Sequence, residues 1–372
     1  MAQPPLHFIV PGSIDRKTGG YGYDRRIIGG LRESGRVVTL HELDGAFPVY
    51  DAAALAAAGM IDALPDGAVV VIDGLALPAF DARITKAVSR LCLVPLVHHL
   101  LRDETSLDDE ARQSLGQCER RCLQFAQRVI VTSPATAVSV AATGVPARDI
   151  SVIVPGVDAP VLDTPALDAR MAEPEAAFSQ DSGNAGLLLM SVGAVIARKG
   201  HMVLIRALAP HRDLDWRLKI FGSLDADPAL SDELRELIVR ERLSDRVELV
   251  GEVEDARLQA EYRRADIFTL ASEYEGYGMA FAEALTHALP VVGSGDGAVG
   301  DTVPATAGLL VPVGDVDALS DALGRVLRDG SLRQTLSEGA RDAGAQLPSW
   351  RVSAARFDQA LERAQAAFAA TK

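Results

Sequence analysis

The sequence predicts an α/β protein of two domains, each a parallel sheet with helices on both faces. Short runs of β-branched and other apolar residues alternate with amphipathic segments along the chain, which is the pattern of buried parallel strands separated by helices. The alternation stops near Asp158 and starts again near Gly186. The length of 372 residues also suits two domains of ordinary size. These three observations favour two α/β units in series.

Strand candidates recur in both halves of the chain. In the first half they are Leu6–Val10, Val37–Leu40, Ala68–Ile72, Leu93–Val97 and Arg128–Thr132. In the second half they are Gly186–Val192, Arg217–Phe221, Val247–Leu249, Ile267–Leu270 and Pro290–Val292. Helices are expected at Asp24–Glu33, Gln113–Gln127, His201–Leu208, from Met279 onward, and at Ala354–Phe368.

The expected domain boundaries follow from composition. Residues 1–165 form an N-terminal domain and residues 186–345 a C-terminal domain. Residues 166–185, rich in Ala, Pro and acidic residues, lack sustained periodicity and are expected to be a linker. Residues 346–372 are expected to form a C-terminal helix.

Charge, cysteines and hydropathy limit the partners. The 37 Lys and Arg against 51 Asp and Glu give a net charge of −14, which disfavours binding to nucleic acid or anionic lipid. A phosphate-bearing ligand therefore needs a local cluster of donors. Three Cys fit a reducing compartment without disulfides. No apolar run reaches the roughly 18–20 residues that span a bilayer, and the N-terminus shows no secretory signal, so a soluble, cytoplasmic protein is expected.

The densest chemical signal lies between residues 271 and 290. A strand candidate leads into a loop with two glycines, Gly276 and Gly278, and a helix begins near Met279. Glycines let backbone N–H groups approach a ligand, and a helix start supplies unpaired donors and a positive dipole end. The acid in this loop, Glu275, indicates a binding site. Taken alone, Glu283 on the following helix is expected to be an acid on the solvated face of the helix and not a ligand contact.

A second signal is the basic pair Arg198–Lys199, which follows an apolar strand and precedes a helix. A diphosphate would contact both side chains and the helix end. The alternative is that Arg198 and Lys199 are exposed basic residues of a loop without a ligand. Near the N-terminus, Thr18–Gly22 follows the first strand and suits a phosphate-binding or substrate-binding turn. His98 and His99 follow another strand, at the sheet edge where ligands of open α/β sheets bind. Since adjacent residues of an extended segment point in opposite directions, one of the two is expected to face a cleft.

Other patterns are interpreted as coincidences. A G-x-G-x-x-G match at Gly295, Gly297 and Gly300 comes late in the chain and precedes a poor helix start, so it does not indicate a dinucleotide site. Two D-x-D matches are expected by chance among so many acids. Cys118 and Cys122 suit packing on one helix face better than metal binding.

Several of these segments together resemble the retaining glycosyltransferases of the GT-B fold, specifically the large family 4. Residues 275–285 resemble the E-x₇-E motif of that family, and residues 192–201 resemble its diphosphate loop. Residues 131–137 with 155–158 resemble the end of its N-terminal domain, and residues 307–315 the segment after its donor site. The family often has Arg at the position of Ala194, and Arg198 is the candidate replacement.

The resemblance implies two Rossmann-like domains facing across a cleft, with the donor bound mainly by the C-terminal domain. Glu283 would hold the ribose hydroxyls and Glu275 the hydroxyls of the transferred sugar. Backbone amides of Gly278, Met279 and Ala280 would face the sugar or its phosphates. The Arg198–Lys199 pair would bind the diphosphate, and Lys199 would neutralise it as it leaves, so that no metal or other cofactor is expected.

In the N-terminal domain, the resemblance implies that Gly19 and Gly20 pass close to the donor phosphates and that His98 lies near the transferred sugar. The C-terminal helix would cross back onto this domain. The implied reaction moves a hexose-type sugar from a UDP-, GDP- or ADP-linked donor to a small-molecule or glycan acceptor. A GT-B-shaped nucleotide-sugar 2-epimerase and a non-catalytic sugar-nucleotide-binding protein are the alternatives, and a nicotinamide dehydrogenase ranks last.

Overall fold

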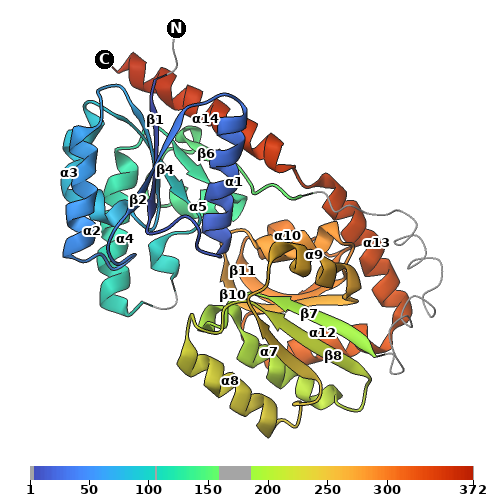
Figure 1. Cartoon of the computed structure of the whole chain (residues 1–372). Coiled ribbons are helices and arrows are strands. Elements are labelled where there is room, and N and C mark those ends of the chain that lie inside the picture. The colour runs from blue at the N-terminus through green and yellow to red at the C-terminus, as the bar shows by residue number, and fades with distance from the viewer. Residues whose placement is uncertain (1–3, 105–106, 159–185, 372) are drawn as a thin grey trace. The chain divides into compact units, whose positions relative to one another are not determined.

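A computed structural model describes residues 4–104, 107–158 and 186–371 of the chain (Figure 1). These residues divide into two compact units. The first unit comprises the chain up to Gly156 together with Pro348 onward, and the second unit runs from Val157 to Leu347. The expected linker, residues 166–185, lies outside the described residues.

The first unit contains a six-stranded parallel sheet with the order β2-β1-β3-β4-β5-β6. Its strands are β1 (Leu6–Pro11), β2 (Val38–Leu43), β3 (Val69–Asp73), β4 (Cys92–Val97), β5 (Val129–Val131) and β6 (Ile150–Val152). Its α-helices in the described residues are α1 (Gly19–Glu33), α2 (Ala52–Ala57), α3 (Asp81–Val88), α4 (Asp109–Gln124), α5 (Pro134–Ala141) and α14 (Trp350–Ala370).

Both faces of the first sheet are covered by helices because its strands are apolar on both sides. Val69 and Val71 of β3 join a core with residues of α1 and α14, while Val70 and Ile72 join a second core with α3, α4 and α5. Helix α14 lies along α1 (Figure 1). The approach is close at Gly30, where an added Cβ would come within 2.5 Å of the Ala354 Cβ.

The second unit contains another six-stranded parallel sheet, with the order β12-β11-β10-β7-β8-β9. Its strands are β7 (Leu187–Val192), β8 (Trp216–Phe221), β9 (Val247–Gly251), β10 (Ile267–Glu275), β11 (Val291–Gly297) and β12 (Gly308–Val311). Its α-helices in the described residues are α7 (His201–Leu208), α8 (Pro228–Arg240), α9 (Asp255–Arg264), α10 (Met279–Thr286), α11 (Val299–Thr302), α12 (Val316–Arg328) and α13 (Gly330–Gln346).

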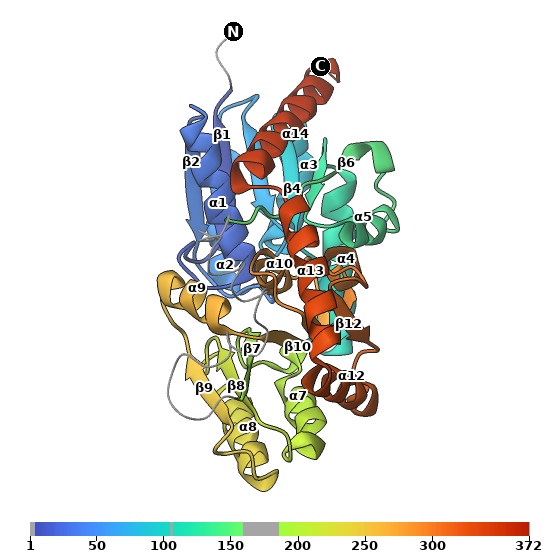
Figure 2. The same ribbon diagram turned by 90° about the vertical axis from the view of Figure 1, so that its right-hand side faces the viewer.

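The second sheet is also covered on both faces. Leu189 of β7 packs into a core with α7, α8 and α12, whereas Met190, the next residue, packs into a core with α9, α10 and α13. Figure 2 shows α10 beside α13 in this unit. The expected class, two Rossmann-like α/β domains in series, is thus confirmed.

Two local predictions were wrong. The expected turn Thr18–Gly22 largely belongs to α1, which begins at Gly19 and runs through the glycines without a break. Glu275 is not in a loop but ends β10, because the strand resumes pairing with β11 after an irregularity between Ala271 and Tyr274. The G-x-G-x-x-G match at residues 295–300 is not followed by a long helix, as expected. It spans the end of β11 and the four-residue helix α11.

Cys92, Cys118 and Cys122 are free and buried. Among the described residues, no helix has the length and apolar character needed to cross a bilayer.

Glu119 of α4 is a buried acid that makes the first unit sensitive to pH. Its carboxylate accepts hydrogen bonds from the backbone N–H of Leu101 at 3.1 and 3.3 Å. Burial raises the pKa of Glu119 to about 8, although the hydrogen bond from Leu101 acts in the opposite direction. The folded state therefore keeps a proton that the unfolded chain, with a glutamate pKa of about 4.3, releases. Stability conferred by this site consequently falls as pH rises between about 4.3 and 8.

Replacing Glu119 by Gln is expected to remove this pH dependence. The variant should gain stability relative to the wild type at pH 8, by on the order of a few kcal/mol, and gain little at pH 4.5. Urea unfolding at both pH values measures the difference, and Glu110→Gln, an exposed acid of the same helix, is the control. An equal effect of Glu119→Gln at the two pH values would contradict the assignment.

Candidate functional site

The strand order of the second unit defines where a ligand is expected. From β7 the chain builds the sheet outward through β8 and β9, and then returns to the other side of β7 with β10. Connections after β7 and β10 therefore leave the sheet in opposite directions, and the crevice at such a switch point is where open α/β sheets bind ligands. Lys199 follows β7 and Glu275 ends β10, so both lie at this point.

At the switch point, the structure brings the predicted basic pair and the predicted acid together. The Lys199 Nζ lies 2.6 Å from Oε1 of Glu275, and the Arg198 Nη1 lies 3.5 Å from Oε2. Arg198 also donates a hydrogen bond to the backbone oxygen of Tyr274 at 2.8 Å, and Ser272 Oγ donates to Glu275 Oε1 at 2.8 Å. Burial alone raises the pKa of Glu275, but the positive charges of Lys199 and Arg198 lower it below its ordinary value. The group is therefore a carboxylate at neutral pH.

Two glycines make room for this arrangement. Gly200 has φ +65°, and an added Cβ would lie 1.8 Å from the Ala271 backbone oxygen, so α7 starts directly against β10. An added Cβ on Gly193 would lie 3.0 Å from Cδ of Lys199, so the lysine chain lies across this residue. The ammonium is thereby directed along the end of β7 toward Glu275.

The start of α10 supplies backbone donors to the same unit. Gly278, with φ +89°, precedes the helix and provides no side-chain cap, so the first-turn amides of Met279 and Ala280 have no such partner. Glu283, one turn further, accepts a hydrogen bond from the hydroxyl of Tyr262, which lies 3.0 Å from Oε2. Tyr262 is fully buried and stacks on His287 with an interplanar angle of 2°. Glu283 is thus held by α9 and is not simply a solvated acid.

The first unit has its own switch point, between β1 and β3. Gly19 and Gly20 open α1, the first helix after β1, and Thr18 offers no side-chain cap. Tyr21 holds this segment by donating its hydroxyl to the backbone oxygen of Pro11. The uncapped N-terminus of α1 is therefore fixed at the sheet edge, where it can bind an anion.

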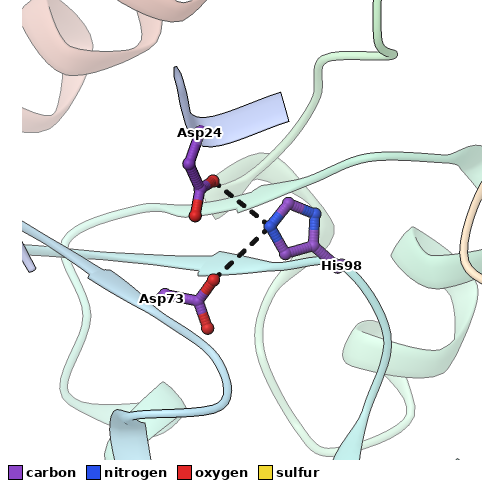
Figure 3. Close-up of side chains that lie close together, drawn as sticks. All are labelled: Asp24, Asp73 and His98. Carbon is purple, nitrogen blue, oxygen red and sulfur yellow. Dashed lines mark hydrogen bonds and ion pairs between the residues drawn. The ribbon is translucent and has the colours of Figure 1, made fainter. Parts of the chain in front are cut away.

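His98 lies beside Gly20, since an added Cβ there would come within 3.4 Å of the ring carbon Cδ2. Its Nε2 lies 3.3 Å from Oδ1 of Asp24 and 3.5 Å from Oδ2 of Asp73 (Figure 3). Burial by itself lowers the pKa of His98, but the two carboxylates outweigh it and raise the pKa to about 10. Burial raises the pKa of Asp24 to about 7, although His98 acts against this.

The two adjacent histidines follow β4 in a bend and take different partners. His99 Nε2 lies 2.5 Å from Oε1 of Glu104. Sequence reasoning assigned no role to Asp24 or Asp73. A signal was present for both: Asp24 falls on the stripe of α1 that contains Ile27, Ile28 and Leu31, and Asp73 ends an apolar strand.

Each predicted site residue therefore lies at one of the two switch points. Within the second unit, Arg198, Lys199 and Glu275 are in contact, and Glu283 follows the uncapped start of α10. Within the first unit, His98 lies beside Gly20 at the start of α1. The two units are α/β domains in which the predicted residues lie at the sheet edges where open α/β sheets bind ligands.

Comparison with known proteins shows which family and which proteins the chain resembles. Residues 173–343 match the family described as Glycosyl transferases group 1. The chain is 34% identical over 172 residues to the D-inositol 3-phosphate glycosyltransferase of Xylanimonas cellulosilytica, covering 46% of this chain and 41% of that protein. It is 29% identical over 282 residues to the protein of the same name from Pseudarthrobacter chlorophenolicus, covering 72% of this chain and 64% of that protein. The chain thus matches less than two thirds of the length of either relative.

Solved structures show the same fold. Sucrose-phosphate synthase from Thermosynechococcus elongatus superposes with a TM-score of 0.76 at 22% identity, covering 96% of this chain and 98% of that one. Anabaena HepE, solved in complex with UDP-glucose, superposes with a TM-score of 0.74 at 17% identity, covering 97% and 100%. The chain has the GT-B fold, and residues 173–343, just under half of its length, match the glycosyl transferases group 1.

Proposed function

We propose that this protein is a retaining glycosyltransferase that moves a hexose-type sugar from a nucleotide-sugar donor to an acceptor hydroxyl. The group 1 match, the names of the relatives and the UDP-glucose complex of HepE support this class of reaction. The observation that carries the proposal is the contact of Lys199 and Arg198 with Glu275 at the switch point of the second unit.

Charge explains how this arrangement would bind a donor. Arg198 and Lys199 bring two positive charges and Glu275 one negative charge, so the three groups together are cationic. When a diphosphate binds, the Lys199 ammonium would leave Glu275 and pair with the diphosphate instead. Glu275 would keep its hydrogen bond from Ser272. The released carboxylate oxygens would then accept hydrogen bonds from hydroxyls of the transferred sugar. No divalent ion is needed on the diphosphate, because the protein supplies the cations.

The remaining residues have complementary roles in this proposal. Amides at Gly278, Met279 and Ala280 would donate to the donor sugar or its phosphates, and Glu283 would bind the ribose hydroxyls. In the first unit, the start of α1 at Gly19 and Gly20 would bind a phosphate group, and His98 would donate a hydrogen bond to a sugar hydroxyl.

In the chemical step, the acceptor oxygen forms a bond to the anomeric carbon on the face from which the nucleotide leaves. The bond from the anomeric carbon to the phosphate oxygen breaks, and its electron pair stays on the diphosphate. The acceptor proton passes to that departing oxygen, so no further base is required. Lys199 stabilises the charge that develops there.

A donor and acceptor screen tests the proposal. The full chain is incubated with UDP-, GDP- and ADP-linked glucose and mannose and with a panel of sugar, polyol and phosphorylated acceptors. The panel includes inositol 3-phosphate, because the names of two relatives contain this compound. Acceptor-dependent release of the nucleoside diphosphate and an α-linked product are expected. Epimerised donor formed without acceptor, or binding of a donor without turnover toward any acceptor, would overturn the proposal.

Tyr262→Phe is expected to weaken donor binding by about 3–10-fold, because Glu283 loses a hydrogen bond worth about 1 kcal/mol. The turnover number at saturating donor should change little. Thr286→Val is the matched control, since Thr286 Oγ1 donates only to the backbone oxygen of Glu283, at 2.7 Å. Equal nucleotide affinity in wild type and Tyr262→Phe, measured by titration calorimetry, would exclude this positioning role.

A further inference from the structure

The chain passes between the two units twice, after Gly156 and before Pro348. Within the first unit, the segments next to these two crossings lie against each other. An added Cβ on Gly156 would lie 2.6 Å from the carbonyl carbon of Ser349 and closer still to the backbone nitrogen of Trp350. Any larger residue at this position would therefore push the two segments apart.

The segment before the first crossing is held by two buried hydroxyl groups. Tyr23 of α1 donates a hydrogen bond to the backbone oxygen of Ile153 at 2.9 Å. Ser353 of α14 donates to the backbone oxygen of the next residue, Val154, at 2.8 Å. The exposed fractions of Tyr23 and Ser353 are 1% and 0%. Burial, and in addition the charge of Asp24, raise the pKa of the Tyr23 hydroxyl well above its ordinary value, so this group stays a donor at neutral pH.

The ring of Tyr23 also contacts two other rings. Its centroid lies 5.9 Å from that of Trp350, with an interplanar angle of 68°, and 5.4 Å from that of His98, with an angle of 83°. Edge-to-face aromatic pairs favour such distances. The guanidinium of Arg26, three residues later on α1, lies 5.7 Å from the centroid of the Trp350 ring and holds this ring as well. The buried ring of Tyr23 thus joins the two crossing segments to the histidine of the candidate site.

We propose that Tyr23 and Trp350 are positioning residues that couple the chain crossings to the imidazole of His98. Protein interiors are packed as densely as crystals, so a displacement of one ring in such a row displaces the next ring. The two crossings are the covalent connections between the units, so a movement of one unit against the other must act on the backbone at these points. The row of Trp350, Tyr23 and His98 would carry that movement to the site.

The inference rests on the proposed function only through the role of His98 as a hydrogen-bond donor to a sugar hydroxyl. In that function the nucleotide binds to the second unit. Interrupting the row is therefore expected to lower the turnover number, because a donor is misplaced, and to leave the affinity for the nucleoside diphosphate unchanged. A row that only stabilised the fold would not change the surroundings of the His98 ring in folded molecules.

The experiment observes His98 directly. Imidazole nitrogen resonances of the full chain are recorded by NMR, and His98→Gln identifies the signals of His98. These signals are expected to shift in Tyr23→Leu and in Trp350→Leu, because both variants interrupt the row. They should stay in place in Ser353→Ala, the matched control, which removes the neighbouring hydroxyl group from the same segment but no ring. Trp350→Phe, which keeps a ring, should restore most of the wild-type signals.

Turnover provides a second readout. We expect kcat to fall about 10–100-fold in Tyr23→Leu, the scale of a misplacement of about 1 Å at a site. Tyr23→Phe keeps the ring and should recover most of this loss. The affinity of both variants for the nucleoside diphosphate should equal that of the wild type.

Unchanged His98 signals in both leucine variants would overturn the proposal, whether or not the protein transfers sugar. If neither leucine variant folds, fluorotryptophan-labelled wild type decides, with the buried Trp216 of the second unit as the internal reference. The fluorine signal of Trp350 should then change in His98→Gln and not in His99→Gln, and an unchanged signal in both would refute the coupling. The proposed function fails instead if no donor and acceptor pair yields a product, so the two failures are distinguishable.

Discussion

Glu275→Gln is expected to lower the turnover number of sugar transfer by about 100–1000-fold. The substitution keeps the size of the side chain and an oxygen that can accept the hydrogen bond from Ser272, but it removes the charge that faces Lys199 and Arg198. If this carboxylate holds the sugar hydroxyls, its interaction strengthens as positive charge develops on the sugar ring. The loss should therefore appear in the turnover number more than in donor affinity.

Glu273→Gln is the matched control, because it neutralises an acid two residues earlier on β10 that is not part of the contact. Both variants should retain the wild-type circular dichroism spectrum. A turnover number within threefold of the wild type for Glu275→Gln would contradict the role assigned to this residue.

Lys199→Met is the second substitution with a large expected effect. Methionine retains much of the aliphatic chain that lies across Gly193 and removes only the ammonium. We expect kcat/KM to fall about 100–1000-fold, since the group stabilises the charge on the leaving diphosphate. Affinity for the nucleoside diphosphate should fall and depend less on salt, while affinity for the nucleoside alone should stay unchanged.

Lys219→Met separates a loss of charge at the site from a general loss of an ion pair. Lys219 lies 3.0 Å from Oε2 of Glu261 in the same unit, so its removal also breaks an ion pair. The affinity of the Lys219→Met variant for the nucleoside diphosphate should equal that of the wild type. In the double variant of Lys199 and Glu275, the two losses should not add, because the groups are in contact. Fully additive losses of activity in the double variant, or unchanged diphosphate affinity in Lys199→Met, would contradict the proposal that Lys199 moves from Glu275 to the diphosphate.

The fold was predictable because its strands are short apolar runs that recur along the sequence. Patterns of this kind report which segments are buried, and they located β1, β3, β4 and β7 closely and the first residue of β10 correctly. They did not show that Glu275 continues β10, because that pairing depends on an irregular register with β11, a distant contact. They also did not show that α1 begins at Gly19, since glycines ordinarily indicate a turn.

The site was predictable where its residues are neighbours in the sequence and less so where they are not. Arg198, Lys199 and Glu275 were each singled out locally, but their contact joins segments 76 residues apart. Asp24 and Asp73 had no assigned role because one falls on an amphipathic helix and the other at the end of a strand. Their convergence on His98 exists only once the parallel strands bring these three segments to one sheet edge.

Titration calorimetry of the full chain with UDP, GDP and ADP in the presence of EDTA tests most directly whether protein cations alone bind the diphosphate. At least one of the three nucleotides should bind with micromolar affinity, unchanged when Mg²⁺ replaces EDTA, and at least tenfold more weakly to Lys199→Met. Absence of heat with all three nucleotides, or binding that requires the added divalent ion, would contradict the account.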